Sequence, residues 1–231
     1  MKHSVIIPAY NAAAYIEQSV GSTLSQLSAT DEIIIVDDGS TDETVDRVAG
    51  ISDARILFLR QPSNRGVAAA RNRCLEAVTG DYVHFLDHDD LWSAGRMEIL
   101  MSTIEARQPD IISGWAEHFY CDSLSQEQKA KYHLPKPQAA ALPGSVVIRR
   151  TLLEQVGKFD SLLSSGEFID FISRAMMFAP TWVKIDHVLF LRRIHGRNHT
   201  LTDTTSETSY IELIRRHLAR RGVTGRPMTR S

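Results

Sequence analysis

Short, mostly apolar runs recur four times in the first 90 residues, and each is followed by a polar turn and a helix-like pattern. The runs are SVIIP, EIIIV, RILFL and YVHFL, at residues 4–8, 32–36, 55–59 and 82–86. Apolar runs of this length, bounded by turn residues, are typical of strands that are buried on both faces. Strands that alternate with helices predict right-handed βαβ units and a mostly parallel sheet covered by helices. We therefore expect an α/β fold.

The rest of the chain continues this pattern less regularly. Asn11 is expected to cap the first helix, and Ser40 or Thr41 the second. Further helices are predicted over residues 66–78, 95–107, 151–156, 166–178 and 210–220. Further strands are predicted over 110–113, 144–150 and 188–194, and the polar stretch 120–143 is expected to be an irregular loop.

The composition is that of a globular protein without an electrostatic preference for nucleic acid. Of the 231 residues, 43% are apolar and 23% are charged, and the net charge is -2. Cys74 and Cys121 lie in unlike contexts, so neither a disulfide nor a zinc site is expected and a cytoplasmic location is favoured. The N-terminus has no signal-peptide pattern, and no stretch of about 18 apolar residues predicts a membrane span.

Polar turns follow three of the predicted parallel strands. PAYN, DDGS and DHDD should meet at one rim of the sheet, where ligands of α/β proteins bind. DHDD places Asp87, Asp89 and Asp90 within four positions, and crowded carboxylates raise one another's pKa. A positive group is therefore expected beside them. Mg²⁺ or Mn²⁺, hard ions that prefer oxygen ligands, would serve.

Four motifs occur in order at the ends of these strands: IPAYNA (7–12), VDDGSTD (36–42), NRGVAAARN (64–72) and LDHDD (86–90). Together they resemble the inverting glycosyltransferases of family 2, and the resemblance continues through GSVVIRR, GKFD, GEFIDF and RRIHGRN to about residue 200. It implies the GT-A fold, a Rossmann-like three-layer αβα arrangement. A single domain is expected over residues 1–205, with a nucleotide-binding half at about 1–114 and an acceptor-side half at about 115–205. A C-terminal helix and basic tail would follow over 206–231.

The resemblance also implies a binding site for a nucleotide-diphosphate sugar, with a UDP-sugar favoured. The residues that it places there are Pro8, Ala9, Tyr10, Asp37, Asp38, Asn64, Arg71, Asp87 and His88. Asp37 and Asp38 would accept hydrogen bonds from the base and the ribose. Alternatively, these two form a turn, Tyr10 is a core residue, and Arg71 is either a partner of the aspartates or a solvated helix charge.

The metal ligands implied by the resemblance are Asp89, Asp87 and His195. Asp90 is expected to cap the helix that follows it. Arg192, Arg193 and Arg197 would add positive charge beside His195. The alternatives are that DHDD is only an Asp-rich turn and that His195 is a structural histidine.

Inverting transfer requires a general base for the acceptor hydroxyl. Many family members have a Glu-Asp pair at the start of a helix, but here Phe168 takes the place of the Asp. Glu167 is the first candidate for the base and Asp170 the second. The alternative is that Glu167 only stabilises a helix N-terminus.

The sequence thus predicts a metal-dependent inverting glycosyltransferase whose acceptor is a carbohydrate or a lipid-linked molecule. By analogy, cell-surface polysaccharide or glycoconjugate synthesis is the expected setting. A catalytically silent nucleotide-sugar-binding or scaffold protein is the main alternative, and a nucleotidyltransferase is disfavoured because no glycine-rich phosphate loop follows the first strand. Beyond Glu212 the tail has six arginines and no acid, so it is either a peripheral contact with anionic lipid at the inner face of the membrane or a solvated end.

Overall fold

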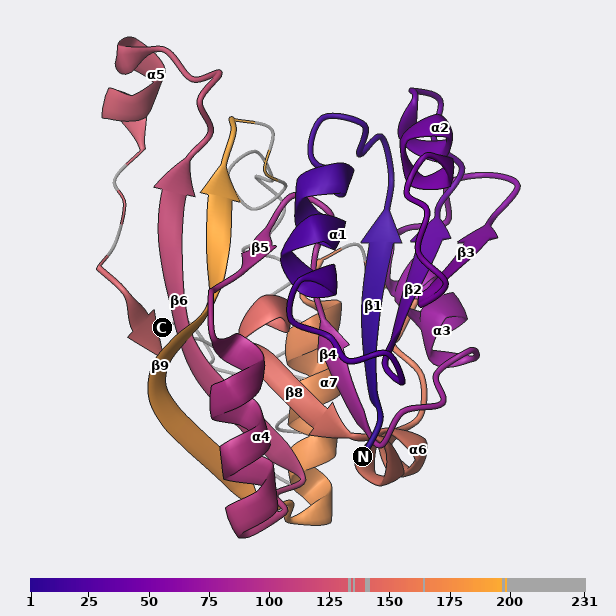
Figure 1. Ribbon diagram of the computed structural model, residues 1–231, viewed down its shortest axis with the longest axis vertical. Helices are drawn as coiled ribbons and strands as arrows, with labels where there is room; N and C mark the ends of the chain where they lie inside the picture. The colour runs from indigo at the N-terminus through magenta and orange to yellow at the C-terminus, as the bar shows by residue number, and fades with distance from the viewer. Residues whose placement is uncertain (133, 135, 140–141, 164, 197, 199–231) are drawn as a thin grey trace, which may run out of the picture.

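The computed structural model describes residues 1–198 except 133, 135, 140, 141, 164 and 197 (Figure 1). One sheet runs through the described part of the chain, in the strand order β3-β2-β1-β4-β8-β6-β9-β5, with β7 paired to β6. Its strands are β1 (His3–Ala9), β2 (Glu32–Asp37), β3 (Ile56–Arg60), β4 (Tyr82–Phe85), β5 (Leu91–Trp92), β6 (Ile111–Tyr120), β7 (Gln138–Ala139), β8 (Val146–Arg149) and β9 (Trp182–Ile194). The helices are α1 (Ile16–Leu24), α2 (Thr44–Ala49), α3 (Val67–Leu75), α4 (Arg96–Arg107), α5 (Gln126–Lys131), α6 (Arg150–Val156) and α7 (Glu167–Ala175), with 3-10 turns η1 (Pro143–Ser145) and η2 (Met176–Phe178).

The N-terminal part of the sheet is parallel, as predicted. β3, β2, β1 and β4 run in one direction, and β9 is parallel to β6. β8 lies antiparallel between β4 and β6, and β5 is antiparallel to β9. An apolar run indicates a strand but not its direction, which is why the sequence did not indicate these reversals.

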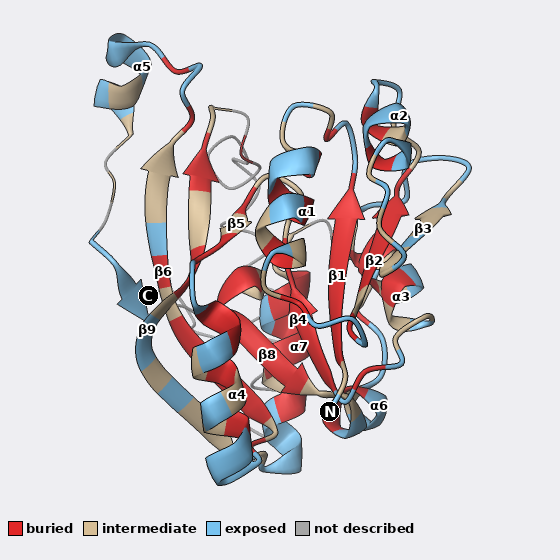
Figure 2. Cartoon of the chain, in the orientation of Figure 1, coloured by how far each residue is buried: buried red, intermediate tan, exposed pale blue. Residues whose placement is uncertain are grey.

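Helices cover both faces of the sheet, because the central strands are apolar on both sides (Figures 1 and 2). Val5 and Ile7 face the core beneath α1, α2 and α4. Ile6 and Ile34 face the opposite core, which α3, α6 and α7 cover. All four side chains are fully buried. The expected three-layer arrangement is confirmed.

The predicted helix caps are wrong. α1 begins at Ile16, and Asn11 instead adopts a left-handed conformation with φ 48°. Its side chain accepts a hydrogen bond from the Thr41 N–H at 2.9 Å, while Ser40 Oγ accepts from the Asn11 N–H at 2.9 Å. α2 begins at Thr44, whose N–H donates to Asp42 at 3.0 Å. Asn11, Ser40 and Thr41 therefore bind the first two polar turns together.

The stretch 120–143 is more ordered than expected. It contains α5, which Ser125 and Gln128 begin with a reciprocal capping box, and the short strand β7. The S-x-x-Q spacing was a visible signal for this helix. β6 and β9 are both longer than predicted. The helix predicted over 166–178 ends earlier, since α7 ends at Ala175 and the 3-10 turn η2 follows it.

The C-terminal predictions, the cysteines and membrane-spanning helices remain to be compared with the structure. Arg197, the helix predicted over 210–220 and the basic tail lie outside the described residues. Cys74 and Cys121 are both free thiols. None of the helices in the described part of the chain has the length and apolar character needed to cross a membrane.

Candidate active site

The first two polar turns meet at the rim formed by the carboxyl ends of the parallel strands (Figure 1). Ala9 pairs with Asp37 in the register of β1 and β2, and the Asp38 N–H donates to the Ala9 carbonyl at 2.8 Å. Pro8 and Ala9 are buried, whereas Tyr10 is 40% exposed. The alternative that Tyr10 is a core residue is therefore wrong, and its ring lies open at the rim.

Asp37 and Asp38 are both buried and both have protein partners. Asp37 accepts from the Ser40 N–H at 3.2 Å and lies 3.3 Å from Arg60 Nε. Asp38 accepts from the N–H groups of Arg65 and Gly66 at 2.9 and 2.8 Å, which fixes the entry to α3. Burial raises the pKa of Asp38, against these backbone hydrogen bonds.

A hollow of about 580 Å³ lies beside these carboxylates, lined by Gly39, Ser40, Thr41, Arg60, Gln61 and Pro62. Arg60 ends β3 and brings a cation to this hollow, a residue that the sequence reasoning missed although it follows the run RILFL directly. Asn64 lies close by and accepts from the Gly66 N–H at 3.0 Å.

Arg71 connects the third carboxylate cluster to α7. Its Nη2 lies 2.6 Å from Asp87, and its Nη1 is hydrogen-bonded to Glu167. The side chain is 3% exposed, and the guanidinium lies about 6 Å from the rings of Phe159 and Phe168. Burial alone would lower the pKa of Arg71, but the two carboxylates raise it. The solvated-charge alternative is wrong, and Arg71 is a partner of the aspartates.

Asp89 and His195 form a second pair, although they are 106 residues apart in the chain. His195 Nε2 lies 2.9 Å from Asp89 Oδ2, and the two side chains are 10% and 17% exposed. Burial would raise the pKa of Asp89, but the hydrogen bond from His195 and nearby positive charge lower it. His88, between the aspartates, is half-buried, with Nδ1 3.3 Å from the Pro8 carbonyl.

The Asp89–His195 pair has the donor set that a divalent ion uses in a nucleotide site. Among the described residues, no group of three or more His, Cys, Asp or Glu side chains is gathered to hold a metal ion. Mg²⁺ and Mn²⁺ often take only one or two protein ligands and complete their coordination with water and substrate phosphates. The Asp89 carboxylate is the kind of oxygen ligand that both ions prefer, and the His195 imidazole, 2.9 Å from it, would be a second ligand. Asp87 differs, because its carboxylate faces Arg71.

The prediction that Asp90 caps the following helix is wrong. α4 begins at Arg96 with Gly95 before it, so Asp90 does not cap this helix. Instead it accepts from the Arg193 N–H on β9 at 2.8 Å and is 6% exposed. Burial and the charges of Asp89 and Asp87 raise its pKa well above the ordinary value. The three crowded carboxylates are thus each provided for differently, by a guanidinium, an imidazole and a backbone N–H.

The two candidate bases lie in the first turn of α7, in unlike surroundings. Glu167 is the first residue of the helix and reaches the rim through Arg71. Asp170 is 2% exposed and pairs with Arg174 at 2.9 Å. Phe168, in the position of the family aspartate, is buried with its ring 5.2 Å from that of Phe85. Glu167 thus joins the rim through its hydrogen bond with Arg71, whereas Asp170 is paired with Arg174.

Residues 4–160 match the sequence profile described as Glycosyl transferase family 2. The chain belongs to this family. A UDP-Glc:alpha-D-GlcNAc-diphosphoundecaprenol beta-1,3-glucosyltransferase of Escherichia coli, WfgD, is 34% identical over 154 residues, which cover 65% of the chain and 61% of that protein. A Haemophilus influenzae glycosyltransferase is 36% identical over 121 residues, 52% of the chain and 48% of that protein. The chain therefore spans less than two thirds of the length of these two relatives.

Solved structures show the same fold. The TarS structure from S. aureus in complex with UDP-GlcNAc superposes with a TM-score of 0.77 and 21% identity, covering 95% of the chain and 66% of that structure. A mannosyltransferase from Pyrobaculum calidifontis in complex with GDP-Man and Mn²⁺ gives a TM-score of 0.69 at 18% identity, covering 97% of the chain and 65% of that structure. The GT-A fold predicted for this family 2 chain is confirmed.

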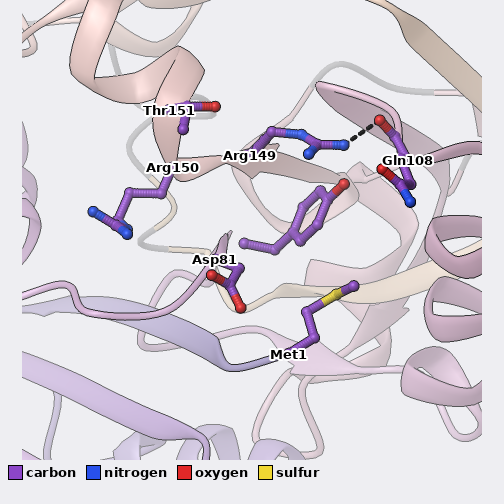
Figure 3. A pocket seen from close by; sticks show the side chains of 7 residues that line it. Met1, Asp81, Gln108, Arg149, Arg150 and Thr151 are labelled. Atoms are coloured by element: carbon purple, nitrogen blue, oxygen red, sulfur yellow. Dashed lines mark hydrogen bonds between the residues drawn. The ribbon is translucent and has the colours of Figure 1, made fainter.

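Figure 3 shows a second pocket of this family 2 chain. It has a volume of about 270 Å³ and is lined by Met1, Asp81, Tyr82, Gln108, Arg149, Arg150 and Thr151. Its arginines have protein partners, since Arg149 donates to the Gln108 carbonyl and lies 5.2 Å from the Tyr82 ring, and Arg150 donates to the Gly80 carbonyl at 2.9 Å. Asp81 and Tyr82 lie at the start of β4 and Asp87 beyond its end, so this pocket is separate from the carboxylate rim.

Proposed function

We propose that this chain is a metal-dependent, inverting glycosyltransferase that moves a sugar from a UDP-sugar to an acceptor hydroxyl. The observation that carries the proposal is the pairing of Asp87 with Arg71 and of Asp89 with His195 on the rim where the PAYN and DDGS turns also meet. In this proposal the nucleotide-binding half spans about residues 1–114, and the acceptor-side half about 115–205.

The donor nucleotide would occupy the hollow beside Asp37 and Asp38. Arg60 supplies a cation there, and Tyr10 an exposed aromatic edge. Asp87, held by Arg71, would accept from a hydroxyl of the donor, and Pro8, Ala9, Asn64 and His88 would complete the surroundings. The UDP-GlcNAc bound to TarS, on the same fold, supports a UDP-sugar donor.

Asp89 and His195 would hold Mg²⁺ or Mn²⁺ beside the diphosphate, with Asp87 as a further candidate ligand. A bound divalent ion would neutralise the charge that develops on the leaving diphosphate. The Mn²⁺ in the Pyrobaculum calidifontis mannosyltransferase supports divalent metal use.

We assign the general base to Glu167. Arg71 donates a hydrogen bond to Glu167 Oε1. No hydrogen bond from a described residue engages Glu167 Oε2, which can accept a proton. In the transfer step, the acceptor oxygen forms a bond to the anomeric carbon as the bond from that carbon to the diphosphate oxygen breaks, and the acceptor proton passes to Glu167. UDP leaves with the bonding electrons. Asp170 is the second candidate, although Arg174 already holds its carboxylate.

The acceptor would be a carbohydrate or a lipid-linked sugar of cell-surface polysaccharide synthesis. The support is the name of WfgD, which acts on a diphosphoundecaprenol-linked sugar. Peripheral membrane contact through the basic tail after Glu212 belongs to this proposal and concerns residues outside the described part of the chain.

Calorimetric titration of UDP, with and without Mn²⁺, tests the donor site. Mn²⁺ is expected to strengthen UDP binding to the wild-type chain. In the presence of Mn²⁺, Asp89→Asn should bind UDP about tenfold or more weakly than the wild-type chain, because a metal ligand is lost while the side-chain shape is kept. Asp53→Asn is the control, since Asp53 pairs with Arg55 away from the rim. If Mn²⁺ has no effect on UDP binding by the wild-type chain, the metal-dependent donor site is wrong.

A silent nucleotide-sugar-binding protein is the second candidate, because Phe168 replaces the family aspartate and Arg71 already engages Glu167. Release of UDP from a panel of UDP-sugars, with Glu167→Gln and Asp170→Asn as variants, separates the two. Turnover that falls about a hundredfold or more in Glu167→Gln alone supports Glu167 as the base. Binding of UDP-sugars without any turnover, in the presence of candidate acceptors, would favour the silent protein.

A further inference from the structure

Arg193 donates three hydrogen bonds at the end of β9, two residues before His195. Its main-chain N–H donates to Asp90 Oδ1, its Nε donates to the Asp89 carbonyl, and its Nη2 donates to Gln18 Oε1, each at 2.8 Å. The residue is 5% exposed. The first two bonds join Arg193 to the DHDD loop, and the third joins Arg193 to α1.

The guanidinium of Arg193 also packs against two aromatic rings. It lies 4.7 Å from the ring of Tyr15, the residue just before α1, and 4.8 Å from the ring of Phe119 on β6. The Tyr15 ring in turn lies 5.1 Å from that of His195, and its hydroxyl lies 3.3 Å from Cys121 Sγ. One buried side chain therefore contacts the DHDD loop, the start of α1 and β6, three segments near the Asp89–His195 pair.

The turn that carries His195 is fixed through Arg193 as well. Asn198 Nδ2 donates to the Arg193 carbonyl at 2.8 Å, while Asn198 Oδ1 accepts from the His195 N–H at 2.9 Å. Hydrogen bonds of Arg193 thus help to fix the backbone at both Asp89 and His195.

We propose that Arg193 is a positioning residue that sets the alignment of Asp89 and His195 for a divalent ion, an inference that rests on the proposed function. Its guanidinium keeps its positive charge, because its hydrogen-bond acceptors are the neutral carbonyl oxygens of the Asp89 backbone and the Gln18 side chain, and it acts on the DHDD loop through these bonds and the two ring contacts. Partners behind the ligands of a metal site typically change metal affinity by about 10- to 100-fold when they are removed.

The test measures Mn²⁺ affinity by electron paramagnetic resonance, metal-free UDP affinity by calorimetry, and the melting temperature of Arg193→Met. Mn²⁺ binding is expected to weaken about tenfold or more, while metal-free UDP affinity stays within about twofold of the wild-type value. Arg149→Met is the matched control, because Arg149 also bonds backbone carbonyls and stacks on a ring, but at the opposite end of the sheet. It should leave both affinities unchanged.

A folded Arg193→Met with wild-type Mn²⁺ affinity would overturn the positioning role, and so would an equal loss of metal-free UDP binding. Arg193→Lys separates position from charge, because lysine cannot form the two side-chain bonds and stack at once. It is expected to bind Mn²⁺ as weakly as the Met variant, and wild-type affinity in the Lys variant would contradict the inference.

If Arg193→Met does not fold, Gln18→Ala decides. Gln18 is exposed on α1, and its loss frees only Arg193 Nη2. Mn²⁺ affinity should fall about threefold, as expected for one lost hydrogen bond of modest net strength, and an unchanged affinity would overturn the proposal. A wild-type chain that binds neither Mn²⁺ nor UDP would instead overturn the proposed function, and the positioning role would fall with it.

Discussion

Arg71 is the residue on which the carboxylate rim depends most directly. It is buried, and it holds Asp87 from the loop after β4 and Glu167 from the start of α7. Removing one member of a buried ion pair leaves the partner charges uncompensated, which is far more costly than losing an exposed pair.

Arg71→Met is expected to lower the free energy of unfolding by about 3 kcal/mol, as measured by urea denaturation. Arg73→Met is the matched control on the same helix, since Arg73 is 49% exposed and pairs with Glu76 at the surface. This control should change the stability by less than about 0.5 kcal/mol. Equal effects of the two substitutions would contradict the structural role assigned to Arg71.

The side-chain partners show where residue-level prediction from sequence stops. The aspartates of the rim could be named in advance because they follow apolar runs. Arg71 could not be placed, because the pattern AAARN gives no sign that Phe159 and Phe168 would bury its guanidinium. Arg193 was expected only as added charge, since its partners come from α1, β6 and the DHDD loop, far away in sequence.

At the scale of elements, the turn after β2 packs directly against the turn after β3. Gly39 has φ +74°, and a Cβ there would lie 2.6 Å from the Ser63 backbone. This close approach requires glycine, because any side chain would both clash and strain the backbone.

Gly39→Ala is expected to destabilise the fold by about 2 kcal/mol and to weaken UDP binding, because it would separate the two turns that form the hollow. Gly21→Ala is the control within α1, where no described atom beyond the adjacent residues and the helix's own backbone lies within 4 Å of the added Cβ. It should stabilise the protein by about 0.5–1 kcal/mol, as helical alanine does relative to glycine. Thermal unfolding and calorimetry of both variants check this prediction.

β1 and β4 carry a buried pair of histidines below the rim. His3 Nδ1 lies 3.0 Å from His84 Nε2, and both residues are almost inaccessible. Burial lowers the pKa of His3 and lowers that of His84 further, with Arg96 and His3 adding to the effect on His84, while Asp31 and Asp81 oppose it on His3.

A lowered pKa in the folded state means that the unfolded chain binds more protons as the pH falls below the ordinary histidine pKa of about 6.5. Stability should therefore be full above that pH and fall between pH 6.5 and 5, by at most about 1.4 kcal/mol per pH unit for each histidine. Urea midpoints across this range check the prediction. His84→Gln should flatten the profile, whereas His187→Gln, at an exposed position on β9, should leave it unchanged.

The strands differ in how accurately the sequence predicted them, and the reasons can be identified. β1 to β4 were located because each is a mostly apolar run. β9 was found only in its last part, because Lys184, Asp186 and His187 are exposed on it and interrupt the apolar pattern. β5 has only two residues and owes its existence to pairing with β9, which no local pattern can show.

At the scale of the whole molecule, the candidate site and the second pocket occupy opposite ends of one sheet. Hydrogen exchange in the presence of UDP and Mn²⁺ should therefore slow at residues 37–41, 87–90 and 193–195, which surround the rim. The segment 149–151, at the pocket of Figure 3, is expected to exchange as in the free protein. Slowing at 149–151 without slowing at the rim would place the nucleotide at the wrong end of the sheet for the proposed chemistry.

The pairing of Asp89 with His195 also has a bearing on how the protein is made. During synthesis from the N-terminus, the first four strands and the DHDD loop leave the ribosome about a hundred residues before the histidine that completes the pair. The DHDD loop is thus synthesised well before its partner, and the Asp89–His195 pair cannot form until the end of β9 has emerged. Premature termination between residues 90 and 195 would release a chain that carries every aspartate of the rim and lacks His195, the partner of Asp89.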